Sequence, residues 1–227
     1  MTDPVRPPPA CSGIVLAGGR STRFGRDKLA EPFDGRPLVD HAIGTVAAIA
    51  SEVILVVPPD AVTSTDRSAE ARIPPDDSWS SAASSRGSHA RLVVIHDPES
   101  YGGPLIGLLA GLGAAREPLA MVVGGDMPGL HPEVLTLMLA RLEAMSDVDA
   151  VALDDGGRIR PLPLAVRVGA GTAAASAAVG RGARSLHALL DGLRIETLTE
   201  RTWRALDPGG DTLRDIDHPS DLDAVPG

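Results

Sequence analysis

Cysteine is almost missing from this sequence of 227 residues, and long apolar runs are absent. The single Cys11 rules out an internal disulfide framework and is compatible with a reducing compartment. The longest apolar stretches, 53–57 and 119–123, fall far below the roughly 20 residues that span a bilayer. The first residues, MTDPVRPPPACSG, contain no apolar segment typical of a secretory signal. These absences predict a cytoplasmic protein.

Positive charge is also scarce, because 21 Lys and Arg residues face 30 Asp and Glu residues and the net charge is −9. This balance argues against nucleic acid or an anionic membrane surface as a partner. Against this background, Arg20, Arg23, Arg26 and Lys28 fall within nine residues and are opposed only by Asp27. An acidic chain that gathers four cations in a glycine-rich turn is suited to hold a small polyanion there.

Short apolar runs alternate with amphipathic stretches along most of the chain. The runs read as buried strands at 13–17, 53–57, 92–95, 119–123 and 149–153. Helical spacing begins at Pro37 and recurs at 105–116 and at 132–145, the last again with a proline at its start. This alternation predicts an α/β fold: a three-layer α/β/α sandwich with a mostly parallel, Rossmann-like sheet.

The last third of the chain has a different rhythm. Residues 154–168 predict a hairpin with a tight Asp-Gly-Gly turn, which gives the sheet a small antiparallel C-terminal portion. The pattern then predicts helices at 172–179 and 185–193, a strand at 194–198, and a short strand with a terminal helix within 211–225.

Two segments fall outside the predicted elements. Residues 58–91 are rich in Ser, Asp, Ala, Pro and Arg, have no periodicity, and predict a flexible surface loop. Residues 1–11 predict a disordered tail. The length suits one α/β domain rather than two, so we expect a single domain over 12–227.

The loop after the first predicted strand begins with Gly18 and Gly19. A glycine-rich loop presents backbone N–H groups that bind phosphate oxygens, and nearby Arg and Lys side chains neutralise the charge. The loop matches neither the Walker pattern GxxxxGK[ST] nor the dinucleotide pattern GxGxxG. A tight turn with solvated cations is the alternative for Gly-Gly alone, and Arg23 and Lys28 favour the phosphate interpretation.

The segment LAGGRSTRFGRDK, residues 16–28, resembles the LAGGxSxRxGxDK signature of the molybdenum cofactor guanylyltransferase family. Three further blocks follow in the family's order: GGPLIGLLAGL at 102–112, GGDMPGL at 124–130 and GRGARSLHALL at 180–190. The resemblance implies a nucleotidyltransferase fold and an enzyme that joins GMP from GTP to molybdopterin.

The resemblance also assigns roles within the loop. It implies that Leu16, Ala17, Gly18 and Gly19 contact the nucleotide and that the cations bind its phosphates, with Arg23 and Lys28 as catalytic groups. Lys28 is expected nearest the transferred phosphoryl group. For Arg20 and Arg26 a solvated role is the alternative.

Asp126 follows the apolar strand 119–123 through two glycines. A carboxylate beyond the end of a parallel strand can hold Mg²⁺, which prefers one or two carboxylates together with phosphate oxygens. The alternative is an Asp that caps the turn before Pro128. The resemblance assigns this Asp directly to Mg²⁺ and makes it the third catalytic residue.

The chain departs from the family pattern at two places. Asp97 and Glu99 both stand where the family has one Asp near the guanine and ribose; Asp97 is the chosen candidate, and spacing cannot decide between them. The family's terminal NxNTPEDL reads DIDHPSDL here, so Asp215 and Asp217 replace asparagines. Asp217 is a candidate second metal ligand, with an acidic helix start as the alternative.

The acceptor side is expected in the C-terminal third, at Arg160, Arg184 and Ser185, with Arg181 nearby. Plain solvated side chains are the alternative for each. The six histidines show no pairing at metal-ligand spacing. No Ser or Cys nucleophile with a nearby base motif is present, so a covalent mechanism is not indicated.

The sequence therefore predicts transfer of GMP from Mg-GTP to molybdopterin with release of pyrophosphate. The exchange of Asn for Asp leaves open a cytidylyl- or other nucleotidyltransferase with a different phosphorylated acceptor. A catalytically silent, nucleotide-binding relative is the third hypothesis. The expected partners are the NTP and molybdopterin, with transient contact with molybdoenzymes or other cofactor-biosynthesis proteins left open.

Overall fold

The structure is a computed structural model of the chain. It describes residues 9–18, 28–59, 71–72, 90–99 and 102–222. Within them, eight strands form one sheet in the order β10-β8-β9-β7-β1-β4-β6-β5. Their bounds are β1 Ser12–Leu16, β4 Glu52–Val57, β5 Ala71–Arg72, β6 Arg91–His96, β7 Leu119–Gly124, β8 Ala150–Asp155, β9 Arg158–Arg167 and β10 Ile195–Leu198.

The centre of the sheet is parallel and its C-terminal side is mixed. Strand β1 pairs in parallel with β4 and β7, and β4 pairs in parallel with β6. Strand β9 runs antiparallel between β7 and β8, and β10 is parallel to β8. Strands β1, β4 and β7 are buried along their whole length, because helices cover both faces of a parallel sheet. The predicted fold class is confirmed.

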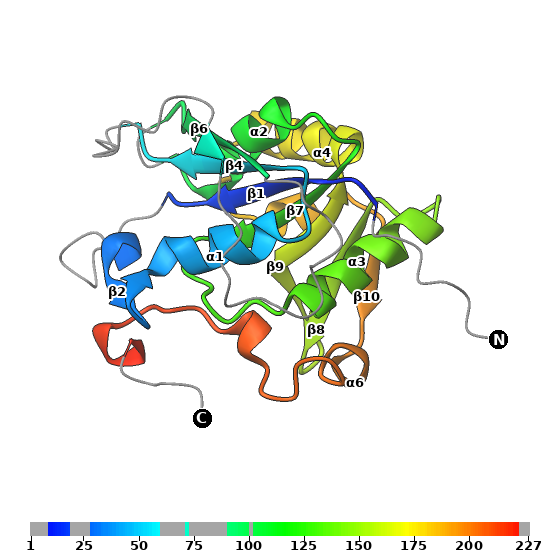
Figure 1. The fold of residues 1–227 in the computed structure, drawn as a ribbon. Coiled ribbons are helices and arrows are strands. Elements are labelled where there is room, and N and C mark those ends of the chain that lie inside the picture. Colours follow the sequence, from blue (N-terminus) through cyan, green and yellow to red (C-terminus); the bar gives the residue numbers. More distant parts are fainter. Residues whose placement is uncertain (1–8, 19–27, 60–70, 73–89, 100–101, 223–227) are drawn as a thin grey trace.

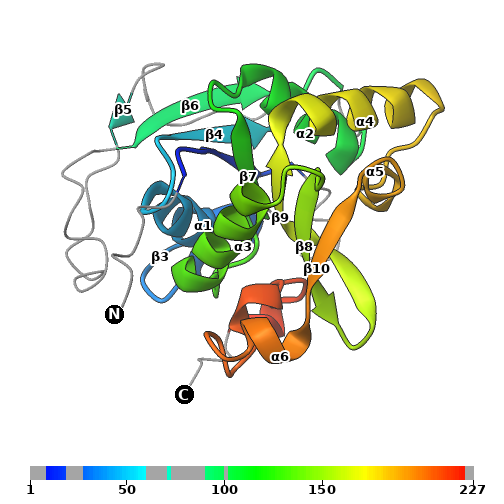
Figure 2. The ribbon, with the colours of Figure 1, turned by 90° about the vertical axis from the view of Figure 1, so that its right-hand side faces the viewer.

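Helices cover the two faces of the sheet in separate layers (Figures 1 and 2). One face carries α1 (Leu38–Ala47) and α3 (Pro132–Ala144). The other carries α2 (Pro104–Ala114), α4 (Val168–Gly180) and α5 (His187–Leu190). Each layer has its own apolar core against the sheet. Among the described residues, no helix has the length and apolar character needed to cross a membrane.

Prolines and glycines place several element ends where the sequence predicts them. Pro104 and Pro132 are the first residues of α2 and α3, where a missing N–H costs nothing. Pro37 lies just outside α1, which begins one residue later than expected. Gly156 and Gly157 have φ of 60° and 86°, as a tight hairpin turn requires, and they join β8 to β9.

The C-terminal segment differs from its prediction. No strand forms over 211–222; the chain makes two 3₁₀ turns, η3 (Asp211–Leu213) and η4 (Pro219–Asp221), and the latter stands in place of a terminal helix. The short helix α6 (Glu200–Trp203) was not predicted. The segment between the turns lies along the loop after β7 and shares one backbone hydrogen bond with it, Ile216 N–H to Asp126 O at 3.0 Å. A single bond of this kind does not build a strand.

The two predicted disordered segments fall mostly outside the described residues. Residues 9–11 are an exception, because Cys11 is fully buried and its carbonyl accepts the N–H of Ser51 at 3.0 Å. The prediction of a disordered tail over 1–11 is therefore wrong for Cys11. Within 58–91, residues 60–70 and 73–89 lie outside the description, whereas 71–72 form β5 against β6.

Candidate active site

The sheet changes winding direction between β1 and β7. From β1 the chain moves out to β4 and β6, and it then returns to β7 on the other side of β1. In open α/β sheets, ligands bind beyond the carboxyl ends of the strands at such a switch point. Leu16 ends β1 there, and Ala17 and Gly18 follow it. Three of the predicted nucleotide ligands therefore lie where the fold favours a ligand.

Leu16 and Ala17 are each only 9% exposed, and their backbone is bonded to neighbouring segments: Ala17 N–H donates to Val56 O, and Leu16 O accepts the N–H of Gly125. The other loop residues, Gly19, Arg20, Arg23, Arg26 and Asp27, lie outside the described residues. The description resumes at Lys28, the first residue of the 3₁₀ turn η1 (Lys28–Ala30).

Lys28 contacts both predicted metal carboxylates. Its Nζ donates to Asp126 Oδ2 at 2.8 Å and lies 3.5 Å from Asp217 Oδ1. It also donates to the carbonyl oxygen of Ile216 at 2.9 Å. The lysine side chain is 16% exposed, whereas Asp217 is 56% exposed and opens to solvent. Three oxygens from two chain segments thus converge on one cationic group.

Two glycines make room for Asp126. A Cβ at Gly124 would lie 2.5 Å from the Asp126 carboxylate. Gly125 donates its N–H to Leu16 O at 2.9 Å, and a Cβ there would lie 3.3 Å from the same oxygen. The Gly-Gly-Asp sequence therefore lets the loop after β7 pass close to the end of β1 and still present its carboxylate.

The segment after η3 brings a third carboxylate to the site. Ile216 is fully buried against Leu38, and successive side chains of an extended chain point to opposite sides. Asp215 and Asp217 therefore flank an apolar anchor. Asp215 Oδ2 accepts from Arg160 Nη2 at 3.1 Å. Arg160 Nη1 lies 3.8 Å from Asp155.

The charges around Asp215 disfavour its ionised form. Burial raises the pKa of this carboxyl, and the neighbouring carboxylates of Asp126 and Asp217 raise it further. Arg160 and Lys28 oppose these effects without cancelling them. The site therefore holds an excess of negative charge, which favours an additional cation.

Asp97 and Glu99, which spacing could not tell apart, have different surroundings. The Asp97 carboxylate accepts the N–H of Glu99 at 3.0 Å, and a Cβ at Gly107 would lie 3.2 Å from it. Asp97 thus faces α2 just beyond the end of β6. Glu99 is 53% exposed and lies 3.9 Å from Arg184.

The predicted acceptor residues separate into two groups. Arg160 joins the aspartates beside Lys28. Arg184 lies at the start of α2, where its carbonyl accepts the N–H of Leu105 at 3.2 Å and a Cβ at Gly103 would approach within 2.8 Å. Ser185 Oγ accepts the N–H of His187 at 3.2 Å. The blocks at 102–112 and 180–190 are therefore neighbours in space.

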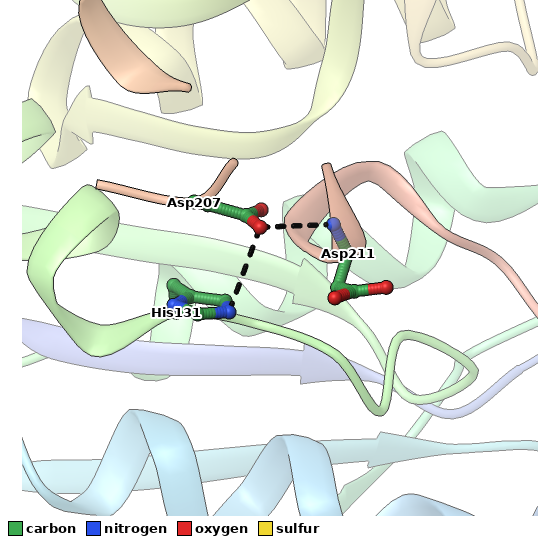
Figure 3. Close-up of side chains that lie close together, drawn as sticks. All are labelled: His131, Asp207 and Asp211. Carbon is green, nitrogen blue, oxygen red and sulfur yellow. Dashed lines mark hydrogen bonds and ion pairs between the residues drawn. The ribbon is translucent and has the colours of Figure 1, made fainter. Parts of the chain in front are cut away.

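His131, Asp207 and Asp211 form a further cluster that no sequence spacing indicated (Figure 3). The buried Asp207 carboxylate accepts backbone N–H groups at 2.9 Å from Gly210, 3.1 Å from Asp211 and 2.7 Å from Thr212. His131 Nε2 lies 3.6 Å from Asp207 Oδ1. Because these hydrogen bonds occupy the carboxylate, we assign it the structural role of shaping the loop before η3.

A glycine loop after β1, a lysine, and two aspartates at the switch point suit a phosphorylated ligand and a divalent cation. The fold and the site together define a nucleotidyltransferase. The model of the MobA-like NTP transferase domain matches residues 13–198, and the chain belongs to this family.

Curated relatives agree with this placement. The chain is 33% identical over 204 residues to a molybdenum cofactor guanylyltransferase of Burkholderia ambifaria, covering 87% of this chain and 91% of the relative. It is 30% identical to a probable molybdenum cofactor guanylyltransferase of Chloroflexus aggregans, covering 94% of this chain and 92% of the relative.

Two solved structures share the fold. Molybdopterin-guanine dinucleotide biosynthesis protein A from Archaeoglobus fulgidus has a TM-score of 0.68 at 21% identity and covers 93% of this chain and 95% of its own. A 2-C-methyl-D-erythritol 4-phosphate cytidylyltransferase from Thermus thermophilus has a TM-score of 0.61 at 19% identity, covering 94% of this chain and 95% of its own.

Proposed function

We propose that this enzyme transfers GMP from Mg-GTP to molybdopterin and releases pyrophosphate. The observation that carries the proposal is the convergence of Asp126 and Asp217 on one cationic position beside the loop after β1. The names of the curated relatives support guanylyl transfer as the reaction. We place the reaction in the cytoplasm, where the buried thiol of Cys11 would stay reduced.

The residues present fit a magnesium ion. The Lys28 ammonium stands among three oxygens, which shows that this position stabilises positive charge. Mg²⁺ takes one or two carboxylates together with phosphate oxygens and water. Asp126 and Asp217 would hold the ion, which when bound neutralises the triphosphate and fixes its orientation.

The chain's own groups then position the reactants. Gly18 and Gly19 would offer backbone N–H groups to the phosphates, with Arg23 and Lys28 neutralising their charge. The acceptor's terminal phosphate oxygen attacks the α-phosphorus in line; the new P–O bond forms as the bond to pyrophosphate breaks. The acceptor is already anionic, so no general base is required. Arg160 is the cation placed to orient it.

Asp97 is our choice for base recognition. Guanine presents two adjacent N–H donors, at N1 and N2, and an ionised carboxylate accepts both. Asp97 lies beyond the end of β6, at the same edge of the sheet as Asp126. Glu99 is turned toward Arg184.

A nucleotide panel tests the proposal. Pyrophosphate release is measured with GTP, CTP, ATP and UTP, each with Mg²⁺ and molybdopterin. We expect GTP to be preferred and Asp126→Asn to lower kcat/KM about 100- to 1,000-fold. Asp147→Asn, an exposed change before β8, is the matched control and leaves the rate unchanged. A protein that binds no NTP in the presence of Mg²⁺ refutes the proposal.

The same panel addresses a second function. Asp215 and Asp217 replace two asparagines of the family pattern, which alters the charge of the acceptor side. A cytidylyltransferase with a different phosphorylated acceptor would release pyrophosphate from CTP in preference to GTP.

A further inference from the structure

Lys28 joins two chain segments that meet only in the folded protein. One is the loop after β7, which provides Asp126; the other is the segment after η3, which provides Ile216 O and Asp217. Only Ile216 of the second segment is anchored in the core, and Asp217 is more than half exposed. The ammonium group draws the two carboxylates toward one point, beside the backbone hydrogen bond from Ile216 N–H to Asp126 O.

This inference rests on the proposed function: we infer that the Lys28 ammonium group alternates between two positions. In the ligand-free enzyme it holds the metal carboxylates together and takes the place of the divalent ion. The phosphates of the nucleotide draw it away, and the ion then binds between the carboxylates and the phosphates. Nucleotide and metal consequently bind as a cooperative pair, and metal alone binds weakly.

Geometry and charge favour this alternation. Mg²⁺ binds carboxylate oxygens at about 2.1 Å. The Lys28 ammonium lies 2.8 Å from Asp126 Oδ2. An ion on the same oxygen would lie within about 5 Å of the ammonium, in a partly buried site where like charges repel strongly. The two cations therefore compete for Asp126.

The side chain of Lys28 can make the exchange. Its ammonium ends a flexible four-carbon stem, unlike the planar fork of arginine. Lys28 closes the loop that starts at Gly18, so phosphates bound by that loop offer it a second anionic partner. Binding energy coupled in this way is reciprocal, so the metal also raises nucleotide affinity.

The test measures Mn²⁺ binding to nucleotide-free protein by titration calorimetry. We expect Lys28→Gln to bind Mn²⁺ at least about tenfold more tightly than the wild type. Lys28→Arg keeps the charge and should bind Mn²⁺ as weakly as the wild type. Arg160→Gln is the matched control for general electrostatics, since Arg160 contacts Asp215 and Asp155 instead of Asp126. We expect its gain to stay below about threefold.

A Lys28→Gln gain no larger than that of Arg160→Gln overturns the inference. Adding Asp126→Asn to Lys28→Gln should abolish the gain, and retention of the gain would also refute it. Thermal unfolding of each variant establishes that it is folded. If Lys28→Gln does not fold, Lys28→Met takes its place in the same titration, with the same expected gain and the same result against the inference.

Failure of the inference is distinguishable from failure of the proposed function. GTP-dependent transfer with no effect of Lys28→Gln on Mn²⁺ binding contradicts the inference and leaves the function in place. A Mn²⁺ gain in a protein that binds no NTP supports the exclusion of metal by Lys28 and contradicts the function.

Discussion

Arg160 and Asp215 show what single residues contribute to this site. The guanidinium is held between Asp215 and Asp155, and its Nε is buried without a hydrogen-bond partner. A buried donor without a partner is costly, so a rearrangement of Arg160 that gives this N–H an acceptor is favourable. Asp215 therefore positions the Arg160 guanidinium at the rim of the site. One N–H of this guanidinium, at Nε, makes no hydrogen bond among the described residues.

Arg160→Gln is therefore expected to weaken acceptor binding. A charge-assisted hydrogen bond contributes about 1.5–3 kcal/mol, so the KM for the acceptor should rise about 10- to 100-fold. The KM for GTP should change little, because we propose that Lys28 and the glycine loop, not Arg160, bind the phosphates. Steady-state kinetics measures both constants. Arg158→Gln, an exposed change on the same strand, is the control. Equal increases in both KM values would contradict an acceptor role.

At the scale of elements, the loop 207–212 fixes the position of the segment that follows it, which carries Asp215 and Asp217. Asp207 accepts three backbone N–H groups of this loop, and His131 donates its own N–H to Thr212 Oγ1 at 3.2 Å. A Cβ at Gly129 would lie 2.7 Å from Asp211 O, so the loop packs directly on the segment that follows Asp126. This contact aligns the segment that carries Asp126 with the segment that carries Asp215 and Asp217.

Asp207→Ala leaves the N–H groups of Asp211 and Thr212 without their acceptor, whereas the N–H of Gly210 keeps the carbonyl oxygen of residue 207. We expect a loss of about 3 kcal/mol in the free energy of unfolding. Urea denaturation measures the loss, and Asp191→Ala, an exposed change, should cost less than about 0.5 kcal/mol. Equal stability of the two variants would show that the loop does not depend on Asp207.

The same carboxylate gives the fold a pH dependence. Burial alone would raise the pKa of Asp207, but hydrogen bonds from Thr212 and Asp211 outweigh it and lower the pKa below its ordinary value. The ionised group therefore stabilises the fold above the unfolded pKa of about 3.9, and this contribution disappears as the pH falls through the folded pKa. Urea titrations from pH 7 to pH 3 should show a steeper loss below about pH 4 in the wild type than in Asp207→Ala.

At the scale of the whole molecule, ligand binding should stabilise the single sheet on which the site is built. Free ligand at about 100 times its Kd adds about 2.7 kcal/mol, which corresponds to a rise in Tm of about 5–10 °C for a chain of this size. We expect Mg-GTP to produce this shift and Asp126→Asn to reduce it. Differential scanning fluorimetry with the four nucleotides measures it. No shift with any nucleotide would contradict the proposed function.

Much of the architecture is predictable from local sequence, and the exceptions have physical causes. The strands β1, β4 and β7 are continuous apolar runs, and Gly156 and Gly157 determine a tight turn by their conformational freedom. The segment after β10 has no comparable pattern. Its conformation depends on hydrogen bonds of the Asp207 carboxylate to backbone N–H groups three to five residues further on, and on burial of Ile216 against the distant Leu38.

The candidate site shows the same difference between what local sequence predicts and what the tertiary structure determines. Residue types, spacing and the family resemblance predict Lys28 as a phosphate ligand and Asp126 as a metal ligand. Only the tertiary structure decided that Lys28 contacts both Asp126 and Asp217 and that Arg160 pairs with Asp215. Asp126 is 98 residues from Lys28, and Asp215 is 55 residues from Arg160. No local pattern encodes such separations, because packing of the sheet and of the 207–217 segment brings these groups together.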